Sequence, residues 1–333
     1  MNKFFSLLIV SILLSWTSCS TDFSLEGDWE DVPIVYGFIS VQDTAHYIRV
    51  EKAFLEPGGD ATQIAKIPDS LYYDNALVQI EKVLSGEVYT LERVDGNLEG
   101  YPREEGPFAT SPNYLYKIKA DEIDLTGGEE IRLLLTTGEN TEPVTAQTNV
   151  LRKLTPRDNS PSSPAKLYPY DKDVNFSWFI GEFAKVFDFR IRINYKESVP
   201  GSTELVDKSL EWVIDKNLIK EGDPERISVG IRSERFYQFI GGALEPVSDR
   251  FRTLESMDLI IVGGGQEFVD YFEIADANLG ITSSNTIPVY TNLSEGLGIF
   301  TSRYFLVREG IEFDAITMDS LRTGIYTREL SFQ

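Results

Sequence analysis

The sequence predicts a mainly β protein with two β-rich domains: an N-terminal immunoglobulin-like sandwich and a C-terminal antiparallel sheet or sandwich with one packed helix. Short runs rich in Val, Ile, Tyr, Phe and Leu follow one another from residue 33 onward, separated by Gly, Pro, Asp and Asn. Aromatic residues make up 12% of the chain, which suits sheet faces and argues against disorder. A proline- and serine-rich stretch near the middle divides the runs into two groups.

The N-terminus has the layout of an export signal. Lys3 precedes an apolar run from Phe4 to Trp16, and small residues lead into Cys19. The run is shorter than the roughly 20 apolar residues that a membrane-spanning helix needs. We therefore predict a lipoprotein signal peptide at residues 1–18, lipidation of Cys19 and an acidic tether at residues 19–32. An ordinary cleaved signal with an incidental cysteine is the alternative.

Composition excludes several kinds of partner and chemistry. The net charge of −22 repels nucleic acid and anionic lipid headgroups, so membrane attachment is expected only through lipid on Cys19. Cys19 is the only cysteine and His46 the only histidine, which excludes a multi-histidine zinc site and leaves no Cys–His pair in the mature domains. We predict no cofactor, no metal site and no catalytic residue, and we place His46 on a strand or at the edge of one.

The first domain is expected at residues 33–152. Its candidate strands are Ile34 to Ile39, Ala45 to Ala53, Ala76 to Val83, Val88 to Val94, Leu115 to Ala120, Ile131 to Thr137 and Thr145 to Leu151. The intervening stretches at 56–74 and 95–113 exceed the usual loop length, which is typical of functional or mobile loops.

A Pro/Ser linker at residues 153–165 precedes the second domain, residues 166–333. Its candidate strands are Val174 to Trp178, Phe187 to Tyr195, Leu210 to Ile214, Ile227 to Ile231, Ser256 to Val262, Phe268 to Ile274 and Ile299 to Val307. One segment has helical spacing instead, because Phe236, Phe239 and Ile240 recur at i, i+3 and i+4. A helix near residues 234–244 is therefore predicted.

Two stretches resemble ligand motifs and fit structural roles better. Gly263 to Gly265 follow an apolar run, but a dinucleotide fingerprint requires glycine where Phe268 stands, so a glycine turn or bulge is predicted. Five side chains have the spacing of calcium-loop ligands: Asp171, Asp173, Asn175, Ser177 and Glu182. The position that needs glycine is Phe176, and the same residues alternate as a strand, which is the interpretation we favour.

The stretch from Pro288 to Tyr304 is the most distinctive internal segment. Gly296 and Gly298 permit close backbone approach, and a strand begins near Ile299. A structural turn feeding that strand is the simpler interpretation, and a presented recognition loop is the functional one. The candidate recognition residues are Tyr290, Asn292, Gly296, Gly298 and Arg303.

Four segments, at residues 35–55, 149–167, 260–274 and 288–303, carry a resemblance. In them the chain resembles a Bacteroidota family of exported lipoproteins catalogued as a domain of unknown function (the four-two-four-nine type). The resemblance implies an outer-membrane lipoprotein with a TonB-dependent transporter as a candidate partner. The residues after the lipidated cysteine resemble a surface-export signal, which favours the cell surface over the periplasmic face: Ser20, Asp22, Phe23 and Glu26.

The leading functional hypothesis is a non-enzymatic, lipid-anchored binding or accessory protein at the outer membrane or cell surface. A structural or adhesive surface protein is the alternative, with Tyr72, Tyr73 and Tyr101 as exposed loop aromatics. A carboxylate-based hydrolase is less favoured, because it needs two acids facing each other across a cleft and the sequence selects no such pair.

Overall fold

The computed structural model describes residues 32–53, 60–138, 142–219, 222, 225–277 and 289–333. The predicted signal peptide, Cys19 and the tether up to residue 31 lie outside these ranges. The fold is mainly β, as predicted. Within the described ranges, no helix is long and apolar enough to cross a bilayer.

The elements run through the chain as follows. The strands are β1 (Val32–Ile39), β2 (Ala45–Ala53), β3 (Leu77–Lys82), β4 (Glu87–Thr90), β5 (Glu92–Asp95), β6 (Tyr114–Lys119), β7 (Glu130–Thr136), β8 (Val144–Asn149), β9 (Thr155–Pro156), β10 (Asp173–Phe179), β11 (Val186–Ser198), β12 (Leu205–Ile219), β13 (Arg226–Arg232), β14 (Arg252–Gly264) and β15 (Leu297–Ile311). The helices are α2 (Ala61–Ile64), α3 (Pro68–Leu71), α4 (Ala120–Ile123), α5 (Ser233–Ala243), α6 (Gln266–Ala277) and α7 (Ala315–Thr323).

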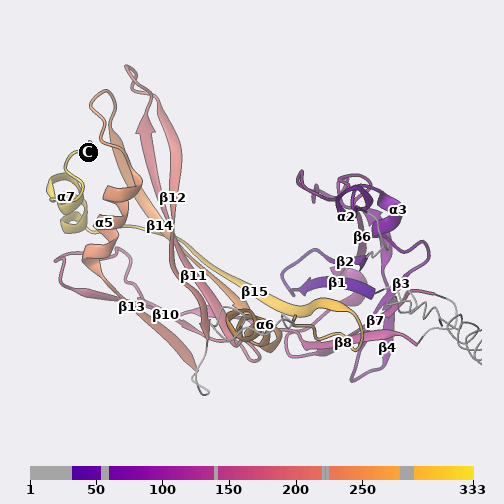
Figure 1. Cartoon of the computed structure of the whole chain (residues 1–333). Coiled ribbons are helices and arrows are strands. Elements are labelled where there is room, and N and C mark those ends of the chain that lie inside the picture. Colours follow the sequence, from indigo (N-terminus) through magenta and orange to yellow (C-terminus); the bar gives the residue numbers. More distant parts are fainter. Residues whose placement is uncertain (1–31, 54–59, 139–141, 220–221, 223–224, 278–288) are drawn as a thin grey trace, which may run out of the picture.

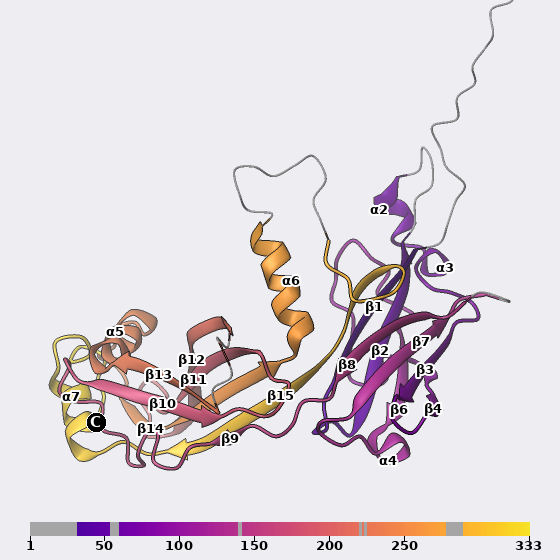
Figure 2. The same ribbon diagram turned by 90° about the horizontal axis from the view of Figure 1, so that it is seen from below.

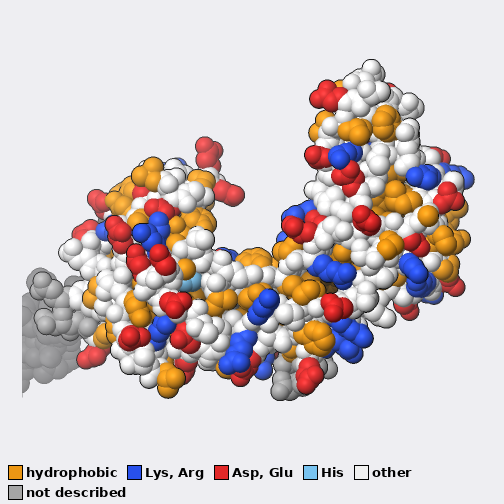
Figure 3. Space-filling view, turned by 180° about the vertical axis from the view of Figure 1, so that it is seen from behind, with side chains coloured by type: hydrophobic (Ala, Val, Ile, Leu, Met, Phe, Trp, Pro, Cys, Tyr) orange, Lys and Arg blue, Asp and Glu red, His pale blue; other side chains and the backbone are white. Residues whose placement is uncertain are grey.

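One eight-stranded sheet, in the order β12-β11-β14-β15-β1-β2-β6-β5, runs through the whole molecule. A four-stranded sheet, β4-β3-β7-β8, completes an N-terminal sandwich, and a three-stranded sheet, β13-β10-β9, covers the other half. The molecule therefore has two lobes, which Figure 1 shows on either side of β15. Seen as a surface, the lobes are joined by a narrower waist (Figure 3).

Strand β15 links the lobes. Its residues 297–302 pair in parallel with β1 of the N-terminal lobe, and its residues 303–311 pair antiparallel with β14 of the C-terminal lobe. The second half of the chain thus supplies a strand to the first lobe.

The predicted linker also takes part in the sheets. Thr155–Pro156 form β9 and pair with β10, while Ala165 bridges to Phe313.

Each lobe packs its core on the same face of the large sheet. Along β11, Phe187 and Phe189 are buried in the C-terminal core, whereas Asp188 and Arg190 project from the other face. In the N-terminal lobe, Phe300 of β15 joins the core of the sandwich. We call the opposite face, which belongs to neither core, the outer face. It is the face on which α6 packs.

Alternation correctly located most strands. His46 lies on β2 and is 1% exposed, and burial lowers its pKa. The middle of the calcium-like run forms β10, in which exposed Asp173 and Asn175 alternate with buried Val174 and Phe176, as the strand interpretation requires. The predicted strand at 88–94 is divided into β4 and β5, because the chain passes from the small sheet to the large one at buried Leu91.

The predicted strand Phe268 to Ile274 is wrong, because this segment is part of helix α6. β14 and β15 pair directly with each other, so α6, which follows β14, lies outside the sheet and stands out from the waist (Figure 2). Helical spacing brings Phe268, Val269 and Phe272 toward the protein, with Val269 5% exposed. The predicted helix near 234–244 is confirmed as α5, and α7 was not predicted.

Candidate functional site

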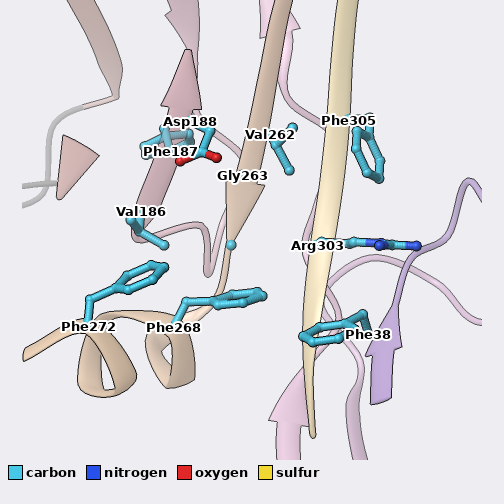
Figure 4. A pocket seen from close by; sticks show the side chains of 11 residues that line it. Phe38, Val186, Phe187, Asp188, Val262, Gly263, Phe268, Phe272, Arg303 and Phe305 are labelled. Atoms are coloured by element: carbon cyan, nitrogen blue, oxygen red, sulfur yellow. The ribbon is translucent and has the colours of Figure 1, made fainter. Parts of the chain in front are cut away.

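A cavity of about 240 Å³ opens on the outer face where the two lobes meet (Figure 4). We call it the junction pocket. It is lined by Phe38, Val186, Phe187, Asp188, Val262, Gly263, Gly264, Phe268, Phe272, Arg303 and Phe305. These residues come from β1, β11, β14, α6 and β15, so the pocket spans the junction of the lobes, with Phe38 contributed by the N-terminal lobe.

Strand register builds the pocket floor. Two rows of residues that are paired across β11, β14 and β15 form it: Val186, Gly264 and Arg303 in one row, and Asp188, Val262 and Phe305 in the other. Gly264 has no side chain, and the Phe268 ring fills the space above it in the first row. A Cβ atom there would lie 2.6 Å from the Phe268 ring and 3.1 Å from Val186, so a larger residue would push the Phe268 ring aside.

Phenylalanine rings form the walls. Phe268 and Phe272 are four residues apart on α6 and therefore lie on one helix face, with ring centroids 6.1 Å apart and planes inclined by 17°. Phe268 also stacks on Phe38 of β1 at 5.6 Å and 7°. Figure 4 shows Phe272, Phe268 and Phe38 in a row across the lower part of the view. The result is a set of nearly parallel, flat apolar surfaces.

Arg303 supplies the positive charge at one end of the pocket. Its guanidinium carbon lies 5.1 Å from the Phe305 ring centroid and 6.0 Å from that of Phe38, both within cation–π range. Its ion pair with Asp43 is long, at 3.8 Å. Burial raises the pKa of Asp43, and the charges of Arg303 and His46 oppose that rise. The buried Nε of Arg303 has no hydrogen-bond partner within the described part of the chain.

Asp188 lies at the opposite corner of the floor. Its carboxylate accepts hydrogen bonds from the Asn217 backbone N–H at 3.2 Å and from Arg190 at 3.4 Å. The pocket therefore has a cation at one end, a partnered carboxylate at the other and apolar surface between them. Asp188 is the one acidic side chain among its lining residues, whereas a carboxylate-based hydrolase needs two.

Glu267 fastens the first turn of α6 to β15. Thr301, which is fully buried, donates a hydrogen bond to its carboxylate at 2.8 Å. Burial raises the pKa of Glu267, and the hydrogen bond from Thr301 opposes that rise. The contact positions Phe268, the next residue, against the pocket.

Of the five candidate recognition residues, only Arg303 lines the junction pocket. Tyr290 lies beside α6, with its ring 6.3 Å from that of Tyr271. Burial raises the pKa of Tyr290, and the carboxylates of Asp270 and Glu267 raise it further. Tyr290 therefore supports the helix that forms the pocket wall.

The other three candidate recognition residues stabilise the pairing of strands inside the protein. Asn292 hydrogen bonds with the backbone of Phe300. Gly296 and Gly298 have φ angles of +97° and +118°, and a Cβ on Gly298 would lie 1.9 Å from the Val35 carbonyl oxygen. These two glycines let β15 lie against β1, so this part of the segment matches the structural-turn interpretation.

Most of the residues that line the junction pocket were not predicted from the sequence. Phe268 and Phe272 carried a usable signal, since spacing of i and i+4 indicates a helix face. Phe38 and Val262 carried none, because each belongs to a strand whose neighbours cannot be read locally. The predicted exposed aromatics also need correction, since Tyr72 and Tyr73 are 4% and 7% exposed. Tyr101 is exposed at 53% and packs on Tyr47.

Comparisons with known proteins add little. No family model and no curated protein matches the chain. A solved structure of the chicken CNTN1 FN1-FN3 domains aligns with 84% of this chain at 11% identity and a TM-score of 0.17. The chain covers 65% of that structure's length. A TM-score this low carries no argument about fold or function. In the described ranges, no group of three or more His, Cys, Asp or Glu side chains could hold a metal ion.

Proposed function

We propose that the protein is a non-catalytic binding protein, anchored to the outer membrane by lipid on Cys19 and displayed at the cell surface, that engages its partner through the junction pocket. The observation that carries the proposal is the pocket itself: an open apolar cavity walled by phenylalanine rings, with one incompletely partnered cation. Protein interfaces concentrate binding energy in pockets of this kind, where one buried anchor side chain is desolvated.

The position of the pocket supports this role. It lies at the waist between the lobes, and the elements that line it carry further exposed apolar side chains: Tyr36 on β1 and Tyr271 on α6, each 44% exposed, and Val307 on β15, 45% exposed. A partner seated in the pocket would therefore contact both lobes. The resemblance to outer-membrane lipoproteins makes a TonB-dependent transporter the candidate partner.

Filling the pocket tests the proposal. Val262 lies on the floor, so Val262→Phe would occupy the cavity. Ile260 lies on the same strand and the same face, two residues away and outside the pocket, so Ile260→Phe is the matched control. Phe272→Ala opens the wall and serves as a second variant. Folding of each variant is checked by circular dichroism.

The measurement is mild crosslinking on intact cells, followed by purification of the protein and its adducts. We expect a defined adduct with wild type and with Ile260→Phe, and loss of that adduct with Val262→Phe and Phe272→Ala. A partner captured equally by all four proteins would show that the pocket is not the binding site. Recovery of monomer alone from wild type would overturn the proposal of a stable partner.

A further inference from the structure

The junction pocket has the size and charge of one kind of ligand, which narrows the proposed function. We infer that it binds an aromatic carboxylate, with a benzene-sized ring against Phe268 and Phe272 and the carboxylate on Arg303. The inference rests on the proposed function, because it names the chemistry that the binding protein recognises.

The volume sets the size of the ligand. An apolar cavity of roughly 150 Å³ binds benzene, whereas drug-sized ligands occupy pockets of about 300 Å³ or more. The junction pocket, at about 240 Å³, has room for one ring and a few further atoms. It is too small for a large ligand as a whole, which leaves a single aromatic group.

The walls favour a flat ring. Phe38, Phe268 and Phe272 present nearly parallel planes, inclined by 7° and 17° between successive rings. Flat aromatic groups gain offset-stacked or edge-to-face contacts with such surfaces beyond the burial of apolar area. Gly264 lets the Phe268 ring pack directly on the floor, since it adds no side chain to that row.

Arg303 determines the charge of the ligand. Arg252 shows what full bonding of a buried arginine looks like: it donates to the Glu197 carboxylate at 2.7 Å and to two backbone carbonyls at 3.0 and 3.1 Å. Arg303 has only the 3.8 Å ion pair with Asp43, and its buried Nε is without a hydrogen-bond partner within the described ranges. The side chain as a whole is 36% exposed, so the terminal NH₂ groups of the guanidinium offer donors to an anion.

A carboxylate fits this cation better than a phosphate does. The guanidinium is planar and matches the two oxygens of a carboxylate. A phosphate would bring close to two negative charges to a pocket that holds one arginine and already faces Asp43 and Asp188. In a chain of net charge −22, an anion can be held only where such a local cation outweighs the surrounding acids.

An aromatic ring close to a carboxylate occurs both in a free aromatic acid and at the end of a polypeptide whose C-terminal residue is aromatic. The test uses isothermal titration calorimetry with the full mature chain and four probes: N-acetylphenylalanine, its amide, a tripeptide Gly-Gly-Phe with a free C-terminus, and the same tripeptide amidated. The amides keep the ring and remove the charge. Tighter binding of the free tripeptide assigns the site to a polypeptide C-terminus, and equal binding assigns it to a free acid.

The variants are Arg303→Gln and the matched control Arg192→Gln. Arg192 also lies on the outer face and also has one long ion pair, 3.9 Å to Asp258, but it is outside the pocket. We expect the acids to bind wild type and Arg192→Gln at least about tenfold more tightly than the amides, since a charged hydrogen bond is lost with the amide. Arg303→Gln should remove that difference.

Two results would overturn the inference: equal affinity of wild type for acid and amide, or no binding of the acids at millimolar concentration. The same experiments distinguish failure of this ligand inference from failure of the proposed function. If Val262→Phe abolishes partner capture while acid and amide bind equally, the pocket is a binding site for another chemistry. If the acids bind and no partner is captured, the ligand inference holds and the partner proposal fails.

Discussion

The side chain of Asn292 bonds to both backbone groups of Phe300. Its Nδ2 donates to the Phe300 carbonyl at 2.7 Å, and its Oδ1 accepts from the Phe300 N–H at 2.9 Å. The carboxamide thus takes the place of a neighbouring strand at Phe300, which lies in the part of β15 that pairs with β1 and not with β14. The connection between the lobes depends on this side chain.

Asn292→Ala should therefore destabilise the protein. It leaves a buried N–H and C=O of Phe300 without these partners, which costs about 1–3 kcal/mol. Urea unfolding measures the loss. Asn175→Ala, at an exposed position of β10, is the control and should change the unfolding free energy by less than about 0.5 kcal/mol. Equal effects of the two changes would contradict the role given to Asn292.

Gly298→Ala should be more severe. Its φ of +118° disfavours any side chain, and the added Cβ would meet the Val35 carbonyl oxygen at 1.9 Å. We expect a loss of about 3 kcal/mol or more and separation of the single unfolding transition into two, because β15 would detach from β1. Gly242→Ala, with open space around it in α5, should instead stabilise by about 1 kcal/mol. Scanning calorimetry compares both variants, and an unchanged transition in Gly298→Ala would refute the link.

The Glu197 cluster should make stability fall in acid. Burial opposes ionisation of Glu197, but hydrogen bonds and charges from Lys208 and Arg252 outweigh it and lower its pKa from 4.5 to about 2. A lowered folded-state pKa contributes stability above pH 4.5, and this contribution is lost as the pH falls toward 2. Glu197→Gln should be less stable than wild type at pH 7, with the difference shrinking across that window. Urea titrations at successive pH values test this, and a constant difference would contradict it.

Glu267 should show the opposite pH dependence. Burial raises its pKa above the usual 4.5, so the folded state favours the protonated form. Its contribution is full below pH 4.5 and is lost as the pH rises through the folded-state value. Glu267→Gln, which can still accept from Thr301, should be more stable than wild type at pH 7 and equal to it near pH 4. The control is exposed Glu273→Gln on the same helix, and a loss of stability at pH 7 in Glu267→Gln alone would oppose the prediction.

Cys19→Ala should release an otherwise folded protein from the membrane fraction. A lipidated cysteine with more than one acyl chain anchors stably, at about 0.8 kcal/mol for each buried methylene. Fractionation of cells and immunoblotting measure the distribution. A variant that remained in the membrane fraction would show that attachment does not depend on Cys19.

Period-two alternation located the strands because it reports which side chains are buried on one sheet face. Phe187 and Asp188 separate into core and outer face as their types predict. Alternation does not report which strands pair. Ser302, for example, donates a hydrogen bond to the Ile39 carbonyl across 263 residues of sequence, and no local pattern predicts that contact.

The junction pocket was not predictable for the same reason. Its floor depends on the register of three strands, and its walls come from α6 and β1. Arg303 was selected from the sequence for its place after a glycine turn, yet its neighbour Phe38 is remote in the chain. The segment Phe268 to Ile274 was misassigned because its apolar residues fit strand alternation and helical spacing about equally well.

Hydrogen–deuterium exchange on the purified complex with the crosslinked partner tests the central claim most directly. If the partner occupies the junction pocket, its binding should slow exchange in α6 and in residues 186–188, 262–264 and 303–307, and Val262→Phe should remove this protection. Protection confined to other surfaces, such as the exposed edge strand β12, with the pocket segments unchanged, would contradict the account.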